Sequence, residues 1–409
     1  MDKFHSPDYD RAIFRVIPTV IAENLKVELG SYNEFVFRAR RIKKFFEESD
    51  ISIVTVFDAM SPSVLKGNLY RFWKQNGGLE LSSVFPTLTT TAGLSINLGM
   101  PPEYHGIPST NVFIREIGNY IDALRGKVVD SDIPLSAAGV DVESFLWRKS
   151  VLSLLGDDII ACDLLPFRIT GGLRDFYGKY LHPLHYDGVL DAIYLLDKLI
   201  DYIIAKRRKG LILLYFSITD TFGHDHGVEM SGWDEMNDKV YEVSRKLIEI
   251  INKKSKPISL YLISDHGLIQ VSKWFILDQQ TLDNIKAHDV AFVGKSGRFM
   301  HIYLNEKADR EEVAGYLMEI LGDYCYVIET EKCAKLLWPW LEDEDSFYER
   351  LGEILVIPKK HVGIFRKKTQ LEDKGLLREF IEKRYMLQGD HGGPTKEEFS
   401  ALFIGYTNK

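Results

Sequence analysis

Cysteine is scarce in this sequence, which has three cysteines among 409 residues. Cys162, Cys325 and Cys333 are odd in number and far apart, which excludes a disulfide scaffold and a cysteine-rich zinc module. Such sparse cysteine usage is typical of a reducing compartment, so we expect a cytoplasmic protein.

Long apolar runs are missing as well. The longest run, residues 211–218, has the length of one buried strand, whereas a membrane-spanning helix needs about 18 or more apolar residues. The first residues also lack the basic start, apolar stretch and small-residue cleavage site of a signal peptide. We therefore expect no association with a membrane.

An excess of positive charge is the third feature that is absent. The chain has 51 Lys and Arg against 59 Asp and Glu, which gives a net charge of −8. Proteins that bind nucleic-acid polymers normally carry a basic surface, so we expect no such partner. A small phosphate substrate is still compatible with this charge, because a metal-lined pocket can reverse the local field.

Three strand-length apolar runs are present, and they indicate the fold. They are rich in β-branched residues and show no clean alternation, which is typical of strands that are covered on both faces. These runs are residues 51–57, 211–218 and 258–263. Helical patterns at residues 188–206 and 233–253 alternate with them, so we predict an α/β sandwich with a largely parallel sheet.

A later segment has a different pattern. A hairpin at residues 289–304, a helix at 310–321 and a strand at 324–328 suggest a small α+β unit inserted beside the main sheet. The chain then returns to a last strand at residues 401–406. We therefore predict a main catalytic part, an inserted subdomain and a return segment: residues 1–273, 274–384 and 385–409.

Aspartate and histidine residues follow the predicted strands, where an α/β sheet collects its ligands. A single Asp at such a place is more often a helix cap, but six residues of this kind are hard to explain as caps. Carboxylates and imidazoles without thiolates suit Zn²⁺, with Mn²⁺ or Fe²⁺ as substitutes, and six ligands suffice for two divalent ions. The six are Asp58, Asp220, His224, Asp265, His266 and His391.

A threonine-rich turn provides a seventh element. A strand predicted at residues 79–85 breaks at Pro86, and a helix begins a few residues later. A hydroxyl at the start of a helix meets free backbone N–H groups and the positive end of the helix dipole. This environment favours an alkoxide and a bound phosphate.

With these motifs, the sequence resembles the alkaline phosphatase superfamily, and within it the type I phosphodiesterase/nucleotide pyrophosphatase branch. The resemblance runs from about residue 51 to the C-terminus and is weak only in the insert. It rests on four motifs in the family's order: FPTLT with LGMPPEYHGI at residues 85–89 and 98–107, DTFGH at 220–224, SDHG at 264–267, and the late His391. The fold implied is an alkaline-phosphatase-like three-layer α/β/α sandwich.

The resemblance also implies the roles of the site residues. One metal would be held by Asp220, His224 and His391, and the other by Asp58, Asp265 and His266 together with Thr89. Thr89 would be the nucleophile, activated by the metal and converted to a phosphothreonine intermediate that water then cleaves.

Two details depart from the family pattern. Thr90 follows Thr89, where nucleotide pyrophosphatases commonly have an aromatic residue that helps to hold the nucleobase. The family's phosphate-binding Asn is out of register by one residue, and Asn111 is the nearest candidate.

The function expected is therefore a two-metal phosphoester hydrolase of the phosphodiesterase or nucleotide pyrophosphatase type, acting on a small molecule. Phosphonoacetate-type phosphonate hydrolysis and phosphomonoester hydrolysis stay open as alternatives on the same site.

Other classes of protein are disfavoured. A non-catalytic binding relative would have lost ligands or the nucleophile, and all seven residues are present. No Cys-x-Pro-x-Arg site lies near Thr89, which disfavours a sulfatase. The FPTLT context of the nucleophile disfavours a cofactor-independent phosphoglycerate mutase.

Overall fold

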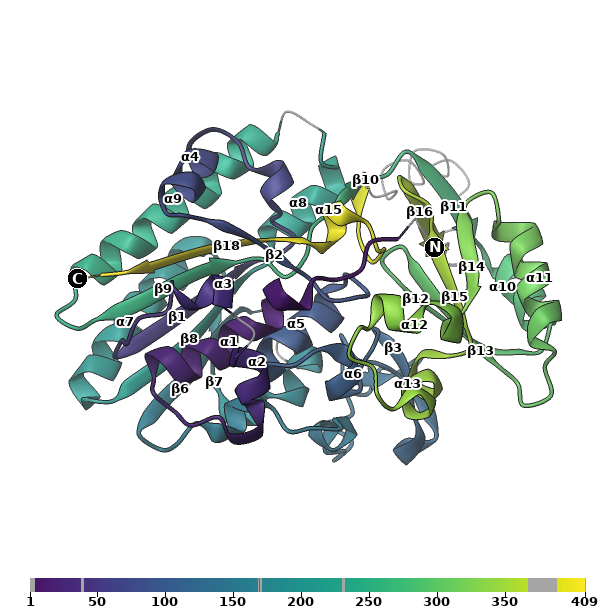
Figure 1. The fold of residues 1–409 in the computed structure, drawn as a ribbon, viewed down its shortest axis with the longest axis horizontal. Coiled ribbons are helices and arrows are strands. Elements are labelled where there is room, and N and C mark those ends of the chain that lie inside the picture. The colour runs from purple at the N-terminus through teal and green to yellow at the C-terminus, as the bar shows by residue number, and fades with distance from the viewer. Residues whose placement is uncertain are drawn as a thin grey trace.

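The computed structural model describes residues 4–37, 40–167, 169, 171–229, 232–366 and 388–408. A seven-stranded sheet forms the larger part of the molecule, and a second sheet lies beside it (Figure 1). The strand order of the large sheet is β2 (Leu79–Ser82), β18 (Ser400–Thr407), β9 (Ile258–Ile263), β1 (Ile51–Phe57), β8 (Lys209–Phe216), β6 (Ile159–Pro166) and β7 (His182–Tyr186).

The central strands of this sheet are parallel. β1 pairs with β8 on one side and β9 on the other, with Phe57 opposite Phe216 and Val56 opposite Ile263. β6 and β7 continue the parallel arrangement, whereas β18 is antiparallel to both β9 and β2. The carboxyl ends of β1, β8 and β9 therefore lie together at one edge, as the sequence predicted for a largely parallel sheet.

Helices cover both faces of the large sheet. One face packs against α4 (Gly67–Gln75), α7 (Val189–Lys206) and α9 (Trp233–Asn252), and the other against α1 (Val16–Thr19), α2 (Asn33–Phe37) and α5 (Thr89–Leu98). The side chains of β1 alternate between these two layers, with Ile53 in the first core and Val54 in the second. This is the three-layer α/β/α sandwich expected from the sequence.

The second sheet has four strands in the order β12 (Val290–Ser296), β13 (Phe299–Leu304), β15 (Ile354–Pro358) and β14 (Cys325–Glu329). Its own apolar core includes α11 (Arg310–Leu321) and α10 (Gln279–Lys286). The predicted hairpin is present, because β12 and β13 pair around a turn at Gly297 and Arg298. The subdomain boundaries at residues 274 and 384 stay predictions, and residue 384 lies outside the described residues.

Smaller elements complete the described structure. A three-stranded sheet of β3 (Asn111–Ile114), β4 (Asn119–Asp122) and β5 (Lys127–Val128) follows α6 (Pro102–His105). A pair of strands, β11 (Lys273–Leu277) and β16 (Val362–Arg366), borders the insert, together with α12 (Thr330–Leu337) and α13 (Glu344–Leu351). Two short helices remain, α3 (Arg40–Lys43) and α15 (Lys396–Phe399).

Two strands end at least two residues away from the sequence prediction, whereas the other predicted elements agree to within one residue at each end. The strand expected at 79–85 ends at Ser82, and the strand expected at 211–218 runs from Lys209 to Phe216. The second difference arises because Ile218 begins α8 (Ile218–His226), so one apolar run crosses from a strand into a helix. Periodicity alone does not separate a buried strand from the first turn of a buried helix.

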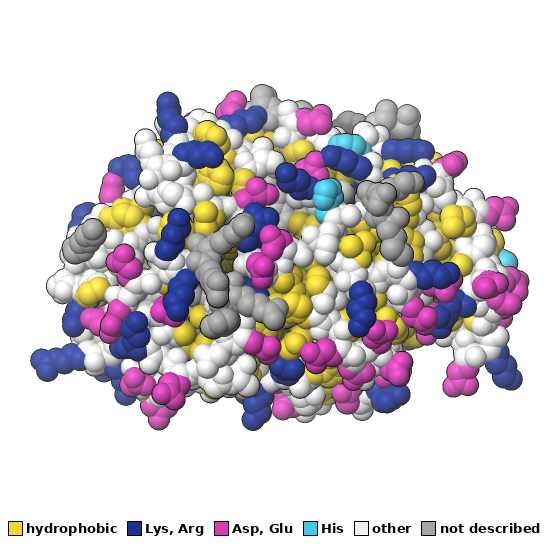
Figure 2. All heavy atoms as spheres, viewed as in Figure 1, with side chains coloured by type: hydrophobic (Ala, Val, Ile, Leu, Met, Phe, Trp, Pro, Cys, Tyr) yellow, Lys and Arg dark blue, Asp and Glu magenta, His cyan; other side chains and the backbone are white. Residues whose placement is uncertain are grey.

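Acidic and basic side chains are interspersed over the face of the molecule that Figure 2 shows. None of the helices in the described ranges combines the length and the apolar composition that crossing a bilayer requires.

Candidate metal centre

Five of the predicted site residues lie just beyond the carboxyl ends of three neighbouring strands. Asp58 follows β1 directly, and Asp265 and His266 come just after β9. Beyond β8 the chain turns into α8, which carries Asp220 and His224 four residues apart. Because these strands are parallel neighbours, the five side chains meet at one edge of the sheet.

Two further residues reach the site from elsewhere. Thr89 is the first residue of α5 and is half-buried. His391 is buried and follows β17 (Gly389–Asp390), which pairs antiparallel with β10 (Ile269–Gln270) just beyond the SDHG motif. The structure therefore brings all seven predicted residues to one place.

The first cluster is formed by Asp58, Thr89, Asp265 and His266. Nε2 of His266 lies 3.2 Å from Oγ1 of Thr89, 3.4 Å from Oδ1 of Asp58 and 3.5 Å from Oδ2 of Asp265. One ligand atom each from Asp58, Asp265 and His266 lie within 4.8 Å of one another, close enough to share an ion.

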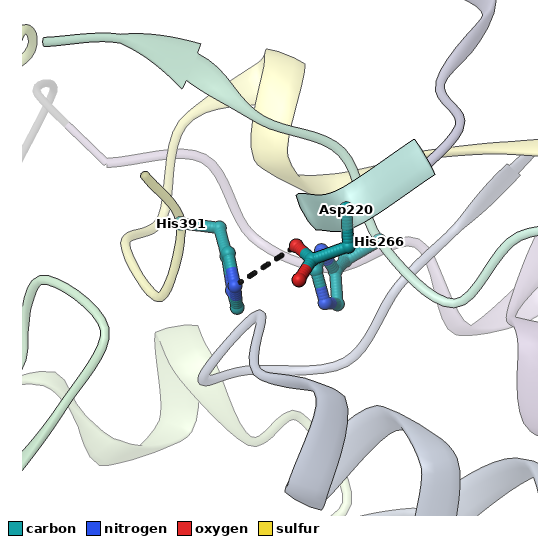
Figure 3. A group of neighbouring side chains, drawn as sticks. All are labelled: Asp220, His266 and His391. Atoms are coloured by element: carbon teal, nitrogen blue, oxygen red, sulfur yellow. Dashed lines mark ion pairs between the residues drawn. The ribbon is translucent and has the colours of Figure 1, made fainter. Parts of the chain in front are cut away.

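The second cluster is centred on Asp220. Its Oδ1 lies 3.3 Å from Nε2 of His224. The same atom lies 3.6 Å from Nε2 of His391, and Figure 3 shows this pair beside His266. Asp390 also has a carboxylate oxygen within 4.8 Å of ligand atoms of His224 and His391, which makes it an additional candidate ligand. The rings of His266 and His391 stack with their centroids 4.0 Å apart, so the two clusters adjoin.

The three imidazoles are oriented in the same way. Nδ1 of His224, His266 and His391 lies 2.8, 3.1 and 2.7 Å from the backbone carbonyl oxygens of Gly389, Gly267 and Thr87, respectively. A carbonyl oxygen only accepts, so each Nδ1 carries the proton and donates. Each Nε2 therefore presents a lone pair to the site, as metal-ligating histidines do.

The carboxylates have oxygens that no hydrogen bond satisfies. Oδ1 of Asp58, Oδ1 of Asp220, Oδ2 of Asp265 and Oδ2 of Asp390 are buried and lack a hydrogen-bond partner among the described residues. A buried carboxylate oxygen without a partner is costly, and a divalent cation is the group that would satisfy several of them at once. The donor set of carboxylates and imidazoles fits such an ion.

The pKa values of these acids are shifted towards the neutral form. Burial raises the pKa of Asp58 well above its usual range, and the charges of Asp265 and Asp220 raise it further. Burial also raises the pKa of Asp220 to about 6. Like charges at this spacing therefore repel one another in the metal-free site.

The pKa values of two of the three histidines are also shifted towards the neutral form, and that of the third is not. Burial lowers the pKa of His266 to about 3 and that of His391 well below its usual range. Burial acts in the same direction on His224, but the charges of Asp220 and Asp390 outweigh it and leave that pKa raised.

The neighbours of Thr89 in the threonine-rich turn have other contacts. Oγ1 of Thr90 lies 2.8 Å from Oγ1 of Thr110, and Oγ1 of Thr87 donates to the carbonyl of Gly393. Thr91 is buried, and its hydroxyl has no partner in the described part of the chain. Of the four, Thr89 is the one whose hydroxyl contacts a candidate metal ligand.

Asn111 begins β3 and is half-buried. Its Oδ1 accepts a hydrogen bond from the backbone N–H of Lys295, at 3.2 Å, which leaves the amide nitrogen as a donor. The role of Asn111 in binding phosphate stays a prediction.

Residues 53–394 match the sequence pattern of the type I phosphodiesterase/nucleotide pyrophosphatase family. The match covers most of the chain. This protein belongs to that family.

Relatives agree with this membership. The chain is 25% identical over 409 residues to ectonucleotide pyrophosphatase/phosphodiesterase 1 of Saccharomyces cerevisiae, covering 87% of this chain and 52% of that protein. The chain thus spans about half the length of the curated relative that it matches.

Solved structures show the same fold. Murine ectonucleotide pyrophosphatase/phosphodiesterase 5 is 17% identical, with a TM-score of 0.62 and 87% of each chain covered. An inactive variant of that murine protein in complex with AMP has a TM-score of 0.60. Phosphonoacetate hydrolase from Sinorhizobium meliloti 1021 in complex with phosphonoformate is 15% identical, with a TM-score of 0.57 and 86% and 89% of the two chains covered.

Sequence reasoning missed Tyr215 in this family member. Its hydroxyl donates a short hydrogen bond to Oδ2 of Asp58, which leaves Oδ1 for a cation. Tyr215 lies in an apolar run and carries no motif, so the only signal was a hydroxyl near the end of a buried strand. The backbone carbonyls that orient the histidines had no sequence signal at all.

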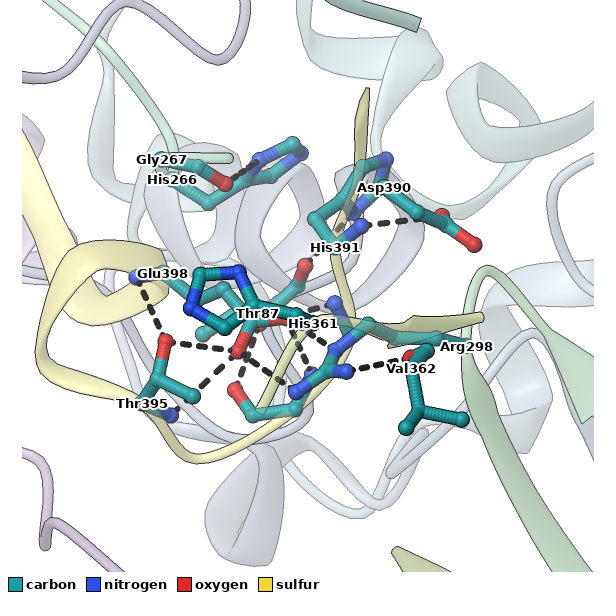
Figure 4. Close-up of polar contacts among 12 residues, drawn as sticks. Thr87, His266, Gly267, Arg298, His361, Val362, Asp390, His391, Thr395 and Glu398 are labelled. Atoms are coloured by element: carbon teal, nitrogen blue, oxygen red, sulfur yellow. Dashed lines mark hydrogen bonds and ion pairs between the residues drawn. The ribbon is translucent and has the colours of Figure 1, made fainter. Parts of the chain in front are cut away.

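The insert also holds part of the site, which the sequence did not predict. The backbone N–H of Arg298, at the β12–β13 turn, donates to the carbonyl of His391 at 2.9 Å (Figure 4). The buried guanidinium of Arg298 pairs with Glu398 at 2.8 Å, and Glu398 accepts from the N–H of Gly393 at 2.8 Å. This buried pair ties the insert to the loop that carries His391.

Replacing Asp220 tests the cost of burying this carboxylate in the metal-free site. A carboxyl whose pKa is raised by folding costs stability once the pH rises above its unfolded value, and this cost is complete above the folded value of about 6. At pH 8, we expect Asp220→Asn to increase the free energy of unfolding of the metal-free protein by about 1–2 kcal/mol, and the gain should vanish below about pH 4. Denaturant titrations at the two pH values measure this.

The exposed Asp132→Asn is the matched control and should change stability little at either pH. A metal-free Asp220→Asn protein that is less stable than the parent at pH 8 would contradict a cost of burying the Asp220 carboxylate.

The Arg298–Glu398 pair provides a second test. Arg298→Met leaves Glu398 as a buried charge without its partner, so we expect the free energy of unfolding to fall by about 3–5 kcal/mol. The control is Arg310→Met in the same insert, which breaks an exposed pair with Glu331 and should cost about 1 kcal/mol or less. Equal losses in the two variants would show that the buried pair has no special role.

Proposed function

We propose that this protein is a two-metal-dependent phosphodiesterase or nucleotide pyrophosphatase in which Thr89 is the nucleophile. The observation that carries the proposal is the position of Oγ1 of Thr89, 3.2 Å from Nε2 of His266 and at the N-terminus of α5. Family membership and the two clusters of unsatisfied ligand atoms support it.

The proposed ions are divalent, with Zn²⁺ preferred for a carboxylate and imidazole donor set and Mn²⁺ or Fe²⁺ as substitutes. Asp58, Thr89, Asp265 and His266 would hold one ion, and Asp220, His224 and His391 the other. Asp390 joins the second set as a candidate ligand. When bound, such ions lower the pKa of a coordinated hydroxyl and neutralise charge on phosphoryl oxygens.

The residues of this chain then have defined tasks. Oγ1 of Thr89 attacks phosphorus, the bond from phosphorus to the leaving oxygen breaks, and the threonine proton is lost as the leaving oxygen gains one. The free N–H groups of the first turn of α5 face the phosphoryl group and favour its negative charge. Water then attacks the phosphothreonine, which releases phosphate monoester and restores the hydroxyl of Thr89.

Structural relatives suggest the range of substrates. The murine relative was solved with AMP, as an inactive threonine-to-alanine variant, and the bacterial relative with phosphonoformate. A small-molecule phosphoester is the first choice, and a phosphonate or a phosphomonoester is the alternative on the same residues. A cytoplasmic location and the absence of nucleic-acid and membrane partners stay predictions.

Substitution of Thr89 tests the nucleophile. We expect Thr89→Ala to lower kcat on bis-p-nitrophenyl phosphate by at least about 10³-fold, because nucleophile deletions do so. Thr89→Ser should retain part of the activity, since serine supplies the same hydroxyl. Release of p-nitrophenol by the metal-loaded protein is the measurement.

Thr90→Ala is the matched control in the same helix turn. It removes a buried hydrogen bond to Thr110 and should cost about 1 kcal/mol of stability with kcat largely retained. If Thr89→Ala turns over normally while Thr90→Ala is inactive, the nucleophile is Thr90.

Removal of metal tests the two-ion proposal. Exhaustive chelation should abolish hydrolysis, and activity should return as about two equivalents of Zn²⁺ or Mn²⁺ per chain are bound, because the proposal assigns two ligand sets. Metal content by mass spectrometry, followed against activity, measures this. Full activity in protein that contains no metal would refute the proposal.

A further inference from the structure

Asp390 is a buried acid of the candidate metal centre to which no sequence motif assigns a role. It lies in β17, directly before His391, and is 1% exposed. The resemblance to the family selected His391 in the GDHGG segment and left its neighbour without a function. A carboxylate that is buried so completely beside a candidate ligand needs a physical explanation.

The strand that carries Asp390 is held against α8. The backbone N–H of Gln388 donates to the carbonyl of His224 at 2.6 Å, and Nδ1 of His224 lies 2.8 Å from the carbonyl oxygen of Gly389. A Cβ on Gly389 would lie 2.4 Å from the carbonyl oxygen of Gly223, so only a glycine permits this close approach. Asp390 therefore stands between a residue that holds one imidazole of the second cluster and the residue that supplies the other.

One oxygen of the Asp390 carboxylate is engaged and the other is not. Oδ1 accepts a hydrogen bond from the backbone N–H of His391 at 2.8 Å (Figure 4). Oδ2 is buried and has no hydrogen-bond partner in the described part of the chain. One carboxylate oxygen of Asp390 and one nitrogen each of His224 and His391 lie within 4.8 Å of one another. An ion held by the two imidazoles would satisfy the oxygen that is otherwise costly to bury.

Asp390 also equalises the charge of the two ligand sets. Asp58 and Asp265 give the first set two carboxylates, whereas Asp220 alone gives the second set one. A divalent ion in the second set would then keep one uncompensated positive charge in a buried place, which costs free energy. With Asp390 the second set has two carboxylates as well.

We infer that Asp390 is a fourth protein ligand of the second ion and that it shifts this set towards Mn²⁺ or Fe²⁺ and away from Zn²⁺. The inference rests on the proposed function for the presence of two ions, and on Asp390 for the difference between them. The preference for Zn²⁺ then applies to the first set.

The number of donors explains this shift. Zinc is usually bound by four ligands, and Asp220, His224 and His391 together with one substrate oxygen already reach that number. Mn²⁺ accepts six ligands and favours carboxylate oxygens. A further carboxylate therefore adds more to the binding of Mn²⁺ than to that of Zn²⁺.

Metal competition on the full chain tests the inference. Metal-free parent and Asp390→Asn are equilibrated in buffers with a rising ratio of free Mn²⁺ to free Zn²⁺, and bound metals are counted by mass spectrometry. The quantity measured is the ratio at which one Mn²⁺ per chain replaces Zn²⁺. In Asp390→Asn this ratio should rise by at least about tenfold, the usual loss when a group that supports a metal is removed. Asparagine still accepts from the N–H of His391, so that loop is retained.

Asp225→Asn is the matched control. Asp225 lies on α8 next to His224 and is exposed, and it belongs to none of the candidate ligand groups among the described residues. Against the effect of burial, the charges of Asp390 and Asp225 both raise the pKa of His224, so each variant removes a negative charge near that imidazole. Asp225→Asn should change the ratio by less than about twofold, because an exposed charge is well screened. Equal shifts in the two variants would mean that Asp390 acts through its charge alone, and would overturn the inference.

A second substitution guards against a local distortion. Asp390→Ser also removes the carboxylate, and its hydroxyl can accept from the N–H of His391, so we expect the same shift as in Asp390→Asn. An unchanged ratio in both variants, with folding verified by circular dichroism, refutes the inference.

The competition is measured without substrate, which separates this inference from the proposed reaction. A tenfold shift that is specific to Asp390 supports the inference even if Thr89→Ala proves as active as the parent, in which case only the proposed function fails. Hydrolysis that depends on two ions, together with an unchanged ratio, refutes the inference and leaves the proposed function in place.

Discussion

Repulsion among buried carboxylates is the constraint on which the rest of this site depends. Parallel pairing of β8, β1 and β9 brings Asp58, Asp220 and Asp265 to one edge of the sheet. Burial raises the pKa values of all three, and the charges of neighbouring acids act in the same direction on Asp58 and Asp220. The fold tolerates the cost of these buried carboxylates because the large apolar cores on both faces of the sheet stabilise the folded chain independently of the site. A cation bound by these carboxylates would offset this cost and so would stabilise the folded protein.

The protein backbone does much of the positioning in this site. Three carbonyl oxygens hold the three imidazoles in one tautomer, and each carbonyl belongs to a segment that also supplies a candidate ligand or to the threonine-rich turn before α5. Side chains then add the remaining restraints, with Tyr215 on Asp58 and the Arg298–Glu398 pair behind His391. A ligand set that is pre-oriented in this way loses little entropy when an ion binds.

Much of this arrangement was accessible from the sequence. The apolar runs at 51–57 and 258–263 coincide with β1 and β9, and parallel pairing alone brings the acids that follow them together. Other parts were not accessible, because they depend on partners distant in the chain. β6 contains the charged Asp163, which is acceptable in a buried strand only because Arg174 pairs with it. The packing of Leu173 against Gly93 of α5 likewise depends on how the segment after β6 returns to the helix, which no local pattern encodes.

The contact between the insert and His391 has a consequence for biosynthesis. A ribosome releases the chain from its N-terminus, so Asp58 and Thr89 leave the exit tunnel long before Arg298, His391 and Glu398. During that interval the nascent polypeptide carries an incomplete set of the candidate site residues. His391 is positioned only after the hairpin of the insert has folded and strand β18 has joined the sheet between β2 and β9. Completion of the candidate site thus waits for segments that are synthesised well after its first residues.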